Sequence, residues 1–212
     1  RPSTFSSQTR GLITSMETNP NNNNNIIEYI TIASLGNAND FGDTTVVTRN
    51  GSGCASSTRG IHYGGYSHPA AGTNAIQYVT IATTGNAADF GDLVDARSQL
   101  MGCSNAVRGL ISGGGEAPGN GVNTIEFVTI ATLGNTQDFG DMTYTNNRDG
   151  ASGASPTRGI VGAGGDPFAS PYAKSDIINY VQIMTTGDAK DFGDLNLARN
   201  HMGGATNGHG GL

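Results

Sequence analysis

The chain has 212 residues, of which 35% are hydrophobic and 13% charged, so it is not a charge-rich disordered polymer. Its net charge of −6 and the lack of a basic stripe argue against nucleic acid as a partner. No apolar run approaches the roughly 18–20 residues of a membrane span and no signal peptide is visible, so we expect no membrane insertion. Because the chain begins with Arg1, we expect a processed product or a piece of a longer protein.

The segments of this chain recur in order with a period near 50 residues, which is the sequence signature of a repeat architecture. The first recurring segment is an Arg-Gly pair followed by apolar residues, and it usually ends in Gly-Gly. Its arginines, spaced by 49, 49 and 50 residues, are Arg10, Arg59, Arg108 and Arg158. Each unit also ends near a second arginine, and these are Arg49, Arg97, Arg148 and Arg199.

The second recurring segment reads I-x-Y/F-V-x-I and predicts a β-strand. Its copies occupy residues 26–34, 75–83, 124–132 and 177–185. It is rich in β-branched and aromatic residues and too short for a free-standing helix. Apolar residues fall on both parities, so we expect both faces of this strand to be partly buried.

The third recurring segment begins with the DFGD motif, whose first residues are Asp40, Asp89, Asp138 and Asp191. Two carboxylates this close could hold Ca²⁺, but the dense acidic run of an EF-hand is missing. A kinase interpretation fails because no catalytic-loop or phosphate-loop motif accompanies it. We therefore predict that the Asp and Gly residues form a turn and that the Phe packs between neighbouring units.

The fourth recurring segment consists of small residues and occupies residues 51–57, 101–106, 150–156 and 203–208. Small residues suit the crowded innermost strand of a propeller. Cys54 and Cys103 hold the same position in adjacent units, and we predict small buried residues near the axis, not a disulfide or a nucleophile. An N-terminal segment could be a fifth copy, but it carries the bulky Phe5 at this position.

Four short strands per unit predict an all-β fold, a β-propeller with four blades of four antiparallel strands. We expect a single domain over residues 1–212, with units at about 9–49, 51–97, 101–147 and 151–199. Residues 202–208 would supply the inner strand of the first unit and close the ring. The alternatives are part of a larger propeller and a stacked solenoid.

The order of these segments resembles the kelch repeat. Gly64-Gly65 and its equivalents stand where that family has Gly-Gly, and "IEY" at 27–29 stands where it has Glu-Tyr. Phe41 and its equivalents replace the family's Trp, which this chain lacks. The wording "TIATTGNAADFGDL" more closely resembles kelch-like repeats in virion structural proteins of marine tailed phages. The resemblance implies a particle component and says nothing about chemistry.

The connections between the first and second segments of each unit differ most between units. A rigid scaffold with variable polar loops on one face is a common arrangement in binding proteins, although such loops are also simply tolerant of change. Aromatic rings and amides there suit sugar recognition. The predicted ligand-binding residues are Asn22, Asn24, Tyr66, His68, Phe168 and Tyr172.

The four arginines of the Arg-Gly segment should lie on the same face as the DFGD aspartates. We expect them to brace those motifs through charge-assisted hydrogen bonds, with a ring of anion-binding arginines as the alternative. The histidines show no zinc spacing and no nucleophile motif is present, so we predict no metal, no cofactor and no enzymatic activity.

The predicted function is a structural or adhesive component of a virus particle, such as a phage tail or surface appendage. Its expected partners are other virion subunits, a cell-surface glycan and further copies of the chain, and its expected location is the virion or the extracellular space. The alternative is a secreted lectin-like propeller. A third hypothesis, an oxidase on a kelch-like propeller, would require copper ligands that the sequence does not single out.

Overall fold

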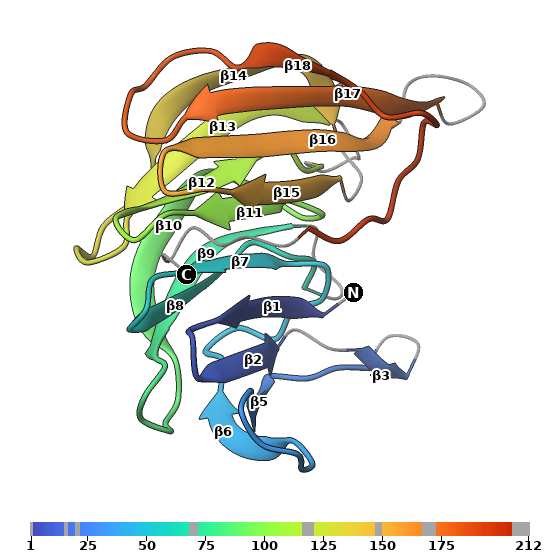
Figure 1. Ribbon diagram of the computed structural model, residues 1–212. Helices are drawn as coiled ribbons and strands as arrows, with labels where there is room; N and C mark the ends of the chain where they lie inside the picture. The colour runs from blue at the N-terminus through green and yellow to red at the C-terminus, as the bar shows by residue number, and fades with distance from the viewer. Residues whose placement is uncertain are drawn as a thin grey trace.

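The computed structural model describes residues 2–14, 17–19, 22–67, 72–115, 121–146, 150–166 and 173–204 of the chain. These residues form an all-β structure with four antiparallel four-stranded sheets and one two-stranded hairpin, and none of them is helical (Figure 1). No helix long and apolar enough to cross a membrane occurs within these ranges. The all-β prediction and the four-strand unit are therefore confirmed.

The first two sheets cover residues 3–97. The first sheet, in the order β1-β2-β5-β6, contains β1 (Ser3–Ser6), β2 (Arg10–Thr14), β5 (Ile26–Thr31) and β6 (Asn39–Asp43). The second sheet, in the order β7-β8-β9-β10, contains β7 (Ser52–Ala55), β8 (Arg59–Tyr63), β9 (Thr73–Thr80) and β10 (Ala88–Arg97). The hairpin between β2 and β5 contains β3 (Glu17–Asn19) and β4 (Asn22–Asn23).

The last two sheets repeat this order. The third sheet contains β11 (Met101–Ser104), β12 (Arg108–Ser112), β13 (Val122–Thr129) and β14 (Gln137–Asn146). The fourth sheet contains β15 (Ala151–Ala154), β16 (Arg158–Asp166), β17 (Ala173–Gln182) and β18 (Lys190–Asp194). The small-residue segments at 51–57, 101–106 and 150–156 form the first strands of the second, third and fourth sheets, and each I-x-Y/F-V-x-I segment forms the third strand of its sheet, as predicted.

Neighbouring sheets pack face to face in chain order. Their first strands lie next to one another, since β1 contacts β7, β7 contacts β11 and β11 contacts β15. The other strands of the first and fourth sheets extend in opposite directions from this inner row (Figure 1). Three separate hydrophobic clusters fill the three spaces between neighbouring sheets. Each third strand is buried on both faces where it has neighbours, as in β13, whose residues Ile125 to Val128 are at most 6% exposed.

The DFGD motif is not the turn that the sequence predicts. It lies inside the fourth strand, and the turn comes before it. In the first sheet Asp40 pairs with Glu28 and Gly42 pairs with Ile27, so Phe41 is an extra residue in a β-bulge. The same shift occurs in the other three sheets. A bulge uses Asp and Gly much as a turn does, and it aims Phe41 at the next sheet.

The inner strand of the first sheet comes from the N-terminus, and the prediction that residues 202–208 supply it is wrong. Strand β1 pairs with one edge of β2 and β5 pairs with the other, so β2 has no free edge for a C-terminal strand; residues 205–208 themselves lie outside the described residues. The bulk of Phe5 is accommodated because Gly53 and Gly60 leave room for its ring in the second sheet. A Cβ atom on Gly53 would lie 2.7 Å from Phe5 Cδ1.

The predicted closure of four units into a ring is not seen in the described residues. In a closed ring Phe192 would be covered by the first sheet as Phe41, Phe90 and Phe139 are covered by their neighbours. Phe192 is 53% exposed, whereas each of the other three is 2% exposed. The first sheet leaves the matching side uncovered, with Ile32 also 53% exposed. The four sheets form an open row, and no described residue packs as a further sheet on either of its two end faces.

Candidate functional site

The arginines of the Arg-Gly segments contact aromatic rings and carbonyl groups, not the DFGD aspartates. The guanidinium groups lie 4.3–4.8 Å from ring centroids in the pairs Arg10–Tyr29, Arg59–Tyr78, Arg108–Phe127 and Arg158–Tyr180. The first three also donate from Nη1 to a carbonyl oxygen of the next sheet, at 2.8–3.2 Å, in the pairs Arg10–Ile81, Arg59–Ile130 and Arg108–Ile183. The arginines brace the sheets, but the predicted partner is wrong.

Each of these rings also meets the Phe of its own DFGD motif edge to face. Centroid distances are 6.0–6.1 Å in the pairs Tyr29–Phe41, Tyr78–Phe90, Phe127–Phe139 and Tyr180–Phe192. Every unit therefore holds the same stack of a guanidinium, an aromatic ring and a Phe ring. In the first three units this stack packs against the next sheet, which explains why the motif recurs.

The glycine of DFGD is required by close approach as well as by its backbone angle. Gly42 has φ +143°, and a Cβ atom there would lie 2.5 Å from the carbonyl carbon of Gly85 in the next sheet. That closeness allows a backbone bond across the gap, in which Gly85 N donates to Phe41 O at 2.7 Å. Ala87 N likewise donates to Asp43 O at 2.8 Å.

An amide or carboxylate side chain completes each sheet junction. Asp43 N donates to Asn86 Oδ1 at 3.0 Å, and the equivalent residue pairs are Asp92–Asn135 and Asp141–Asp188. Sequence reasoning missed these acceptors. The signal was present, because Asn or Asp follows Gly in the same place in every unit.

A second row of acceptors lies on the third strands of the second, third and fourth sheets, and sequence reasoning missed it too. Gln77 accepts from the Thr45 hydroxyl at 2.7 Å, and Asn179 accepts from the Thr143 hydroxyl at 3.0 Å. Between the second and third sheets the acceptor is Glu126, which forms an ion pair with Arg97. Both side chains of that pair are almost fully buried.

The first carboxylates of the DFGD motifs point to solvent. Asp40, Asp89, Asp138 and Asp191 are all exposed. Among the residues the structure describes, no group of three or more His, Cys, Asp and Glu side chains could hold a metal ion. The described geometry therefore contains no assembled carboxylate cluster at this motif.

Tyr66 is the best described of the predicted ligand-binding residues. It forms isolated β-bridges with Arg49 and Gly72, and its backbone N–H donates to Arg49 O at 2.6 Å. The Arg49 guanidinium lies 4.8 Å from the Tyr66 ring centroid. The ring is half-buried and one face is covered by a cation, so Tyr66 has a structural contact in addition to any ligand it binds.

The other predicted ligand-binding residues are described only in part. Asn24 is half-buried, and its Oδ1 accepts from Ile26 N at 3.3 Å, which shapes the start of β5. Asn22 lies in the short strand β4, and its backbone pairs with Asn19. His68, Phe168 and Tyr172 lie outside the described residues. The structure therefore neither joins these residues into one site nor separates them.

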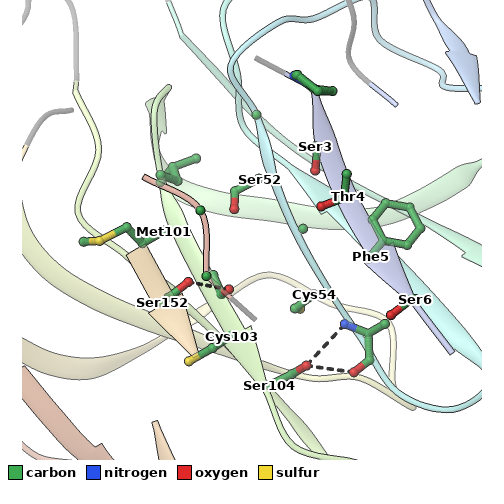
Figure 2. A pocket seen from close by; sticks show the side chains of 18 of the residues that line it. Ser3, Thr4, Phe5, Ser6, Ser52, Cys54, Met101, Cys103, Ser104 and Ser152 are labelled. Carbon is green, nitrogen blue, oxygen red and sulfur yellow. Dashed lines mark hydrogen bonds between the residues drawn. The ribbon is translucent and has the colours of Figure 1, made fainter. Parts of the chain in front are cut away.

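A cavity of about 510 Å³ lies along the inner strands. Figure 2 shows hydroxyl and thiol side chains from β1, β7, β11 and β15 around it. Ser104 Oγ donates to Ala55 O and Ser152 Oγ donates to Gly102 O, each at 2.7 Å, which ties neighbouring inner strands together. None of the described residues lining the cavity is charged, so this lining suits small neutral polar molecules or water.

The two cysteines beside this cavity are buried free thiols, as predicted from their position. Burial raises the pKa of Cys103 to about 12, and burial with the nearby Cys103 raises the pKa of Cys54 further still. Both groups remain protonated thiols near neutral pH. A protonated thiol is a poor nucleophile and a poor metal ligand, so the cysteines act here as small packing residues.

Comparison with protein-family models and with curated proteins finds no match. The resemblance to kelch repeats and to phage particle proteins stays a prediction.

Proposed function

We propose that this protein is a non-enzymatic structural or adhesive module of a virus particle, such as a phage tail or surface appendage. We further infer that its four sheets are consecutive blades of a kelch-like propeller. Four-stranded antiparallel sheets, packed face to face with their first strands in an inner row, support this arrangement. The open row of sheets favours part of a larger propeller over a four-bladed ring.

One observation carries the functional proposal. In the first three units the recurring Arg, Phe and Gly residues are used in contacts between sheets, as Arg10, Phe41 and Gly42 illustrate. The recurrence of these residues therefore reflects how neighbouring sheets pack together. The connections between the second and third strands share one edge of the sheets, and their sequences differ in every unit. The packing of the sheets therefore does not fix the sequence at this edge, which leaves it available for binding. It is the surface that we assign to a host glycan or to neighbouring subunits.

A glycan array tests this assignment. Tyr66→Ala, Phe168→Ala and Tyr172→Ala should each weaken glycan binding by about tenfold, because each removes a ring on which a sugar can stack. Leu133→Ala is the control, since this exposed side chain lies in the connection between β13 and β14, away from that edge. Melting curves of each variant separate lost binding from lost folding, above all for Tyr66.

Co-sedimentation with assembled particles tests the second half of the proposal. A particle component should travel with particles and remain after washing in moderate salt. Glycan binding without particle association would support the secreted lectin-like alternative. Unchanged binding in all three aromatic variants would remove the variable edge from consideration.

A further inference from the structure

We propose that the exposed face of the fourth sheet binds the exposed face of the first sheet in a second copy of this chain, head to tail. The contact would reproduce the junctions already present between neighbouring sheets. This inference goes beyond the proposed function and does not depend on any glycan. It rests on the contacts that repeat at the three inner junctions. It also rests on the apolar side chains, hydrogen-bonding groups and charges of the two end faces that no described sheet covers.

The apolar parts of the two end faces match the inner junctions. At an inner junction the DFGD Phe packs on a Val and an Ile of the next sheet, as Phe139 does on Val181 and Ile183. Ile30 and Ile32 occupy the Val and Ile positions in the first sheet and are 40% and 53% exposed, against 5% and 0% for Val181 and Ile183. Phe192, also 53% exposed, is the side chain that they would cover.

The hydrogen-bonding groups of the two end faces also match. At the junction between the third and fourth sheets, Gly187 N donates to Phe139 O at 2.7 Å, and Asp141 N donates to Asp188 Oδ1 at 3.1 Å. By sequence position the end faces offer Gly36 N to Phe192 O and Asn37 to Asp194 N. The Arg158 guanidinium, which is exposed, would reach Ile32 O as Arg108 reaches Ile183 O.

A charge pair makes this contact specific. Arg97 O accepts from Gly65 N at 2.9 Å, and Arg199 O accepts from the equivalent Gly164 N at 3.0 Å, so the two arginines hold the same place in their sheets. Arg97 forms an ion pair with Glu126 of the next sheet. Glu28 occupies the position of Glu126, pairing with Ile13 as Glu126 pairs with Ile111.

Arg199 on one end face therefore faces Glu28 on the other when two copies meet. Such a contact joins different surfaces of the two copies, so it closes into a ring or continues as a filament. The first and fourth sheets extend in opposite directions from the inner row, which favours closure by two copies (Figure 1). Two copies would then bring eight four-stranded sheets into one ring.

Sedimentation of the full chain over a wide concentration range tests this proposal. The wild-type chain should reach twice the monomer mass. Arg199→Glu and Glu28→Arg should each raise the dissociation constant by about tenfold or more, because each places like charges at both junctions. An equal mixture of the two variants should recover the wild-type mass, since every junction then pairs opposite charges.

Lys190→Glu is the matched control. Lys190 starts β18 and is exposed, and its equivalents Ala88 and Gln137 stay exposed even at the inner junctions. Reversing its charge should leave the dimer unchanged. Circular dichroism establishes that each variant is folded, and Phe192→Ser gives a second disruption that involves no charge.

Two results would overturn the proposal. One is a wild-type chain that stays monomeric throughout, which would mean that other surfaces cover the end faces. The other is a dimer in which mixing the two charge variants brings no recovery, because a contact between identical faces cannot be rescued in this way. Neither result bears on glycan binding, so the functional proposal is tested separately.

Discussion

Phe139 and Phe192 occupy the same position in consecutive units, and each meets an aromatic ring of its own sheet at 6.1 Å. Phe139 is 2% exposed because the fourth sheet covers it, whereas Phe192 is 53% exposed because no described sheet follows. Both places hold the same kind of stack, in which a guanidinium lies over an aromatic ring that meets the Phe edge to face. A DFGD motif therefore forms this stack within its own sheet. Whether the stack is buried or exposed depends on whether another sheet packs against it.

The largest expected effect separates these two phenylalanines. Phe139→Ala should lower the free energy of unfolding by about 3–5 kcal/mol, because it leaves a cavity between two sheets. Phe192→Ala should cost only about 0.5 kcal/mol, because its ring is largely in water already. Urea unfolding of both variants at low protein concentration measures the difference. Equal losses would show that Phe192 is covered in solution.

A second pair of variants separates the stability cost of a steric clash with the next sheet from the cost of backbone strain. Gly140→Ala should cost about 3 kcal/mol, since strain at φ +142° adds to a clash 2.5 Å from Gly187 C. Gly193→Ala should cost about 1–2 kcal/mol, because φ is +133° but no atom lies within 4 Å of the new Cβ. The same unfolding measurement applies, and identical costs would assign the whole effect to the backbone angle.

A third prediction concerns the junction between the first two sheets, where His62 replaces the Ile of the equivalent position Ile111. His62 is buried and bonds the Thr48 hydroxyl at 3.2 Å through Nε2, and burial lowers its pKa from 6.5 to about 4. The unfolded chain therefore takes up this proton first as pH falls. Stability is fully present above pH 6.5 and declines toward pH 4, by about 2 kcal/mol at pH 5.

His62→Ile is the matched variant for this junction. It should flatten the pH dependence between pH 7 and pH 5, while losing the Thr48 hydrogen bond costs about 1 kcal/mol at neutral pH. Melting temperatures measured at pH 7, 6 and 5 give both effects. An unchanged pH dependence in His62→Ile would mean that another group titrates in this range.

The smallest expected effect comes from the aspartates of the motif. Asp89→Ala and Asp191→Ala should each change stability by no more than about 0.5 kcal/mol, because both carboxylates are exposed whether or not a sheet follows. Calcium should leave the melting temperature of the protein unchanged. A strong calcium response that these variants lose would establish a metal site at the motif.

Much of the fold could be predicted from the sequence because the repeats carry it. The spacing of Arg10 and its equivalents defined the units, and the apolar segment at 124–132 predicted a strand buried on both faces. The role of DFGD was harder to predict, because Asp and Gly suit a β-bulge as well as a turn. The pairing register of the fourth strand distinguishes the two, since Phe41 is left over between the pairs Glu28–Asp40 and Ile27–Gly42.

Two errors came from contacts between residues far apart in the sequence. Phe5 looked too large for an inner strand, but Gly53 and Gly60 of the next unit make room for it. The arginines near the end of each unit looked like one series in the sequence. Arg97, however, is buried in an ion pair, whereas Arg49 forms a β-bridge with Tyr66 one position further along its unit. Spacing alone could not separate these roles, because each depends on which partner the next sheet presents.

The separate clusters between sheets also affect how the molecule opens. Each sheet is stabilised mainly by its immediate neighbours, as in a linear repeat array. Within the described part of the chain, the second and third sheets have two neighbouring sheets each, whereas the first and fourth have one. Amide hydrogens of β5 and β18 should therefore exchange through local opening that leaves β9 and β13 protected. Binding at an end face would add a neighbour and slow that exchange, so fraying at the ends reports directly on assembly.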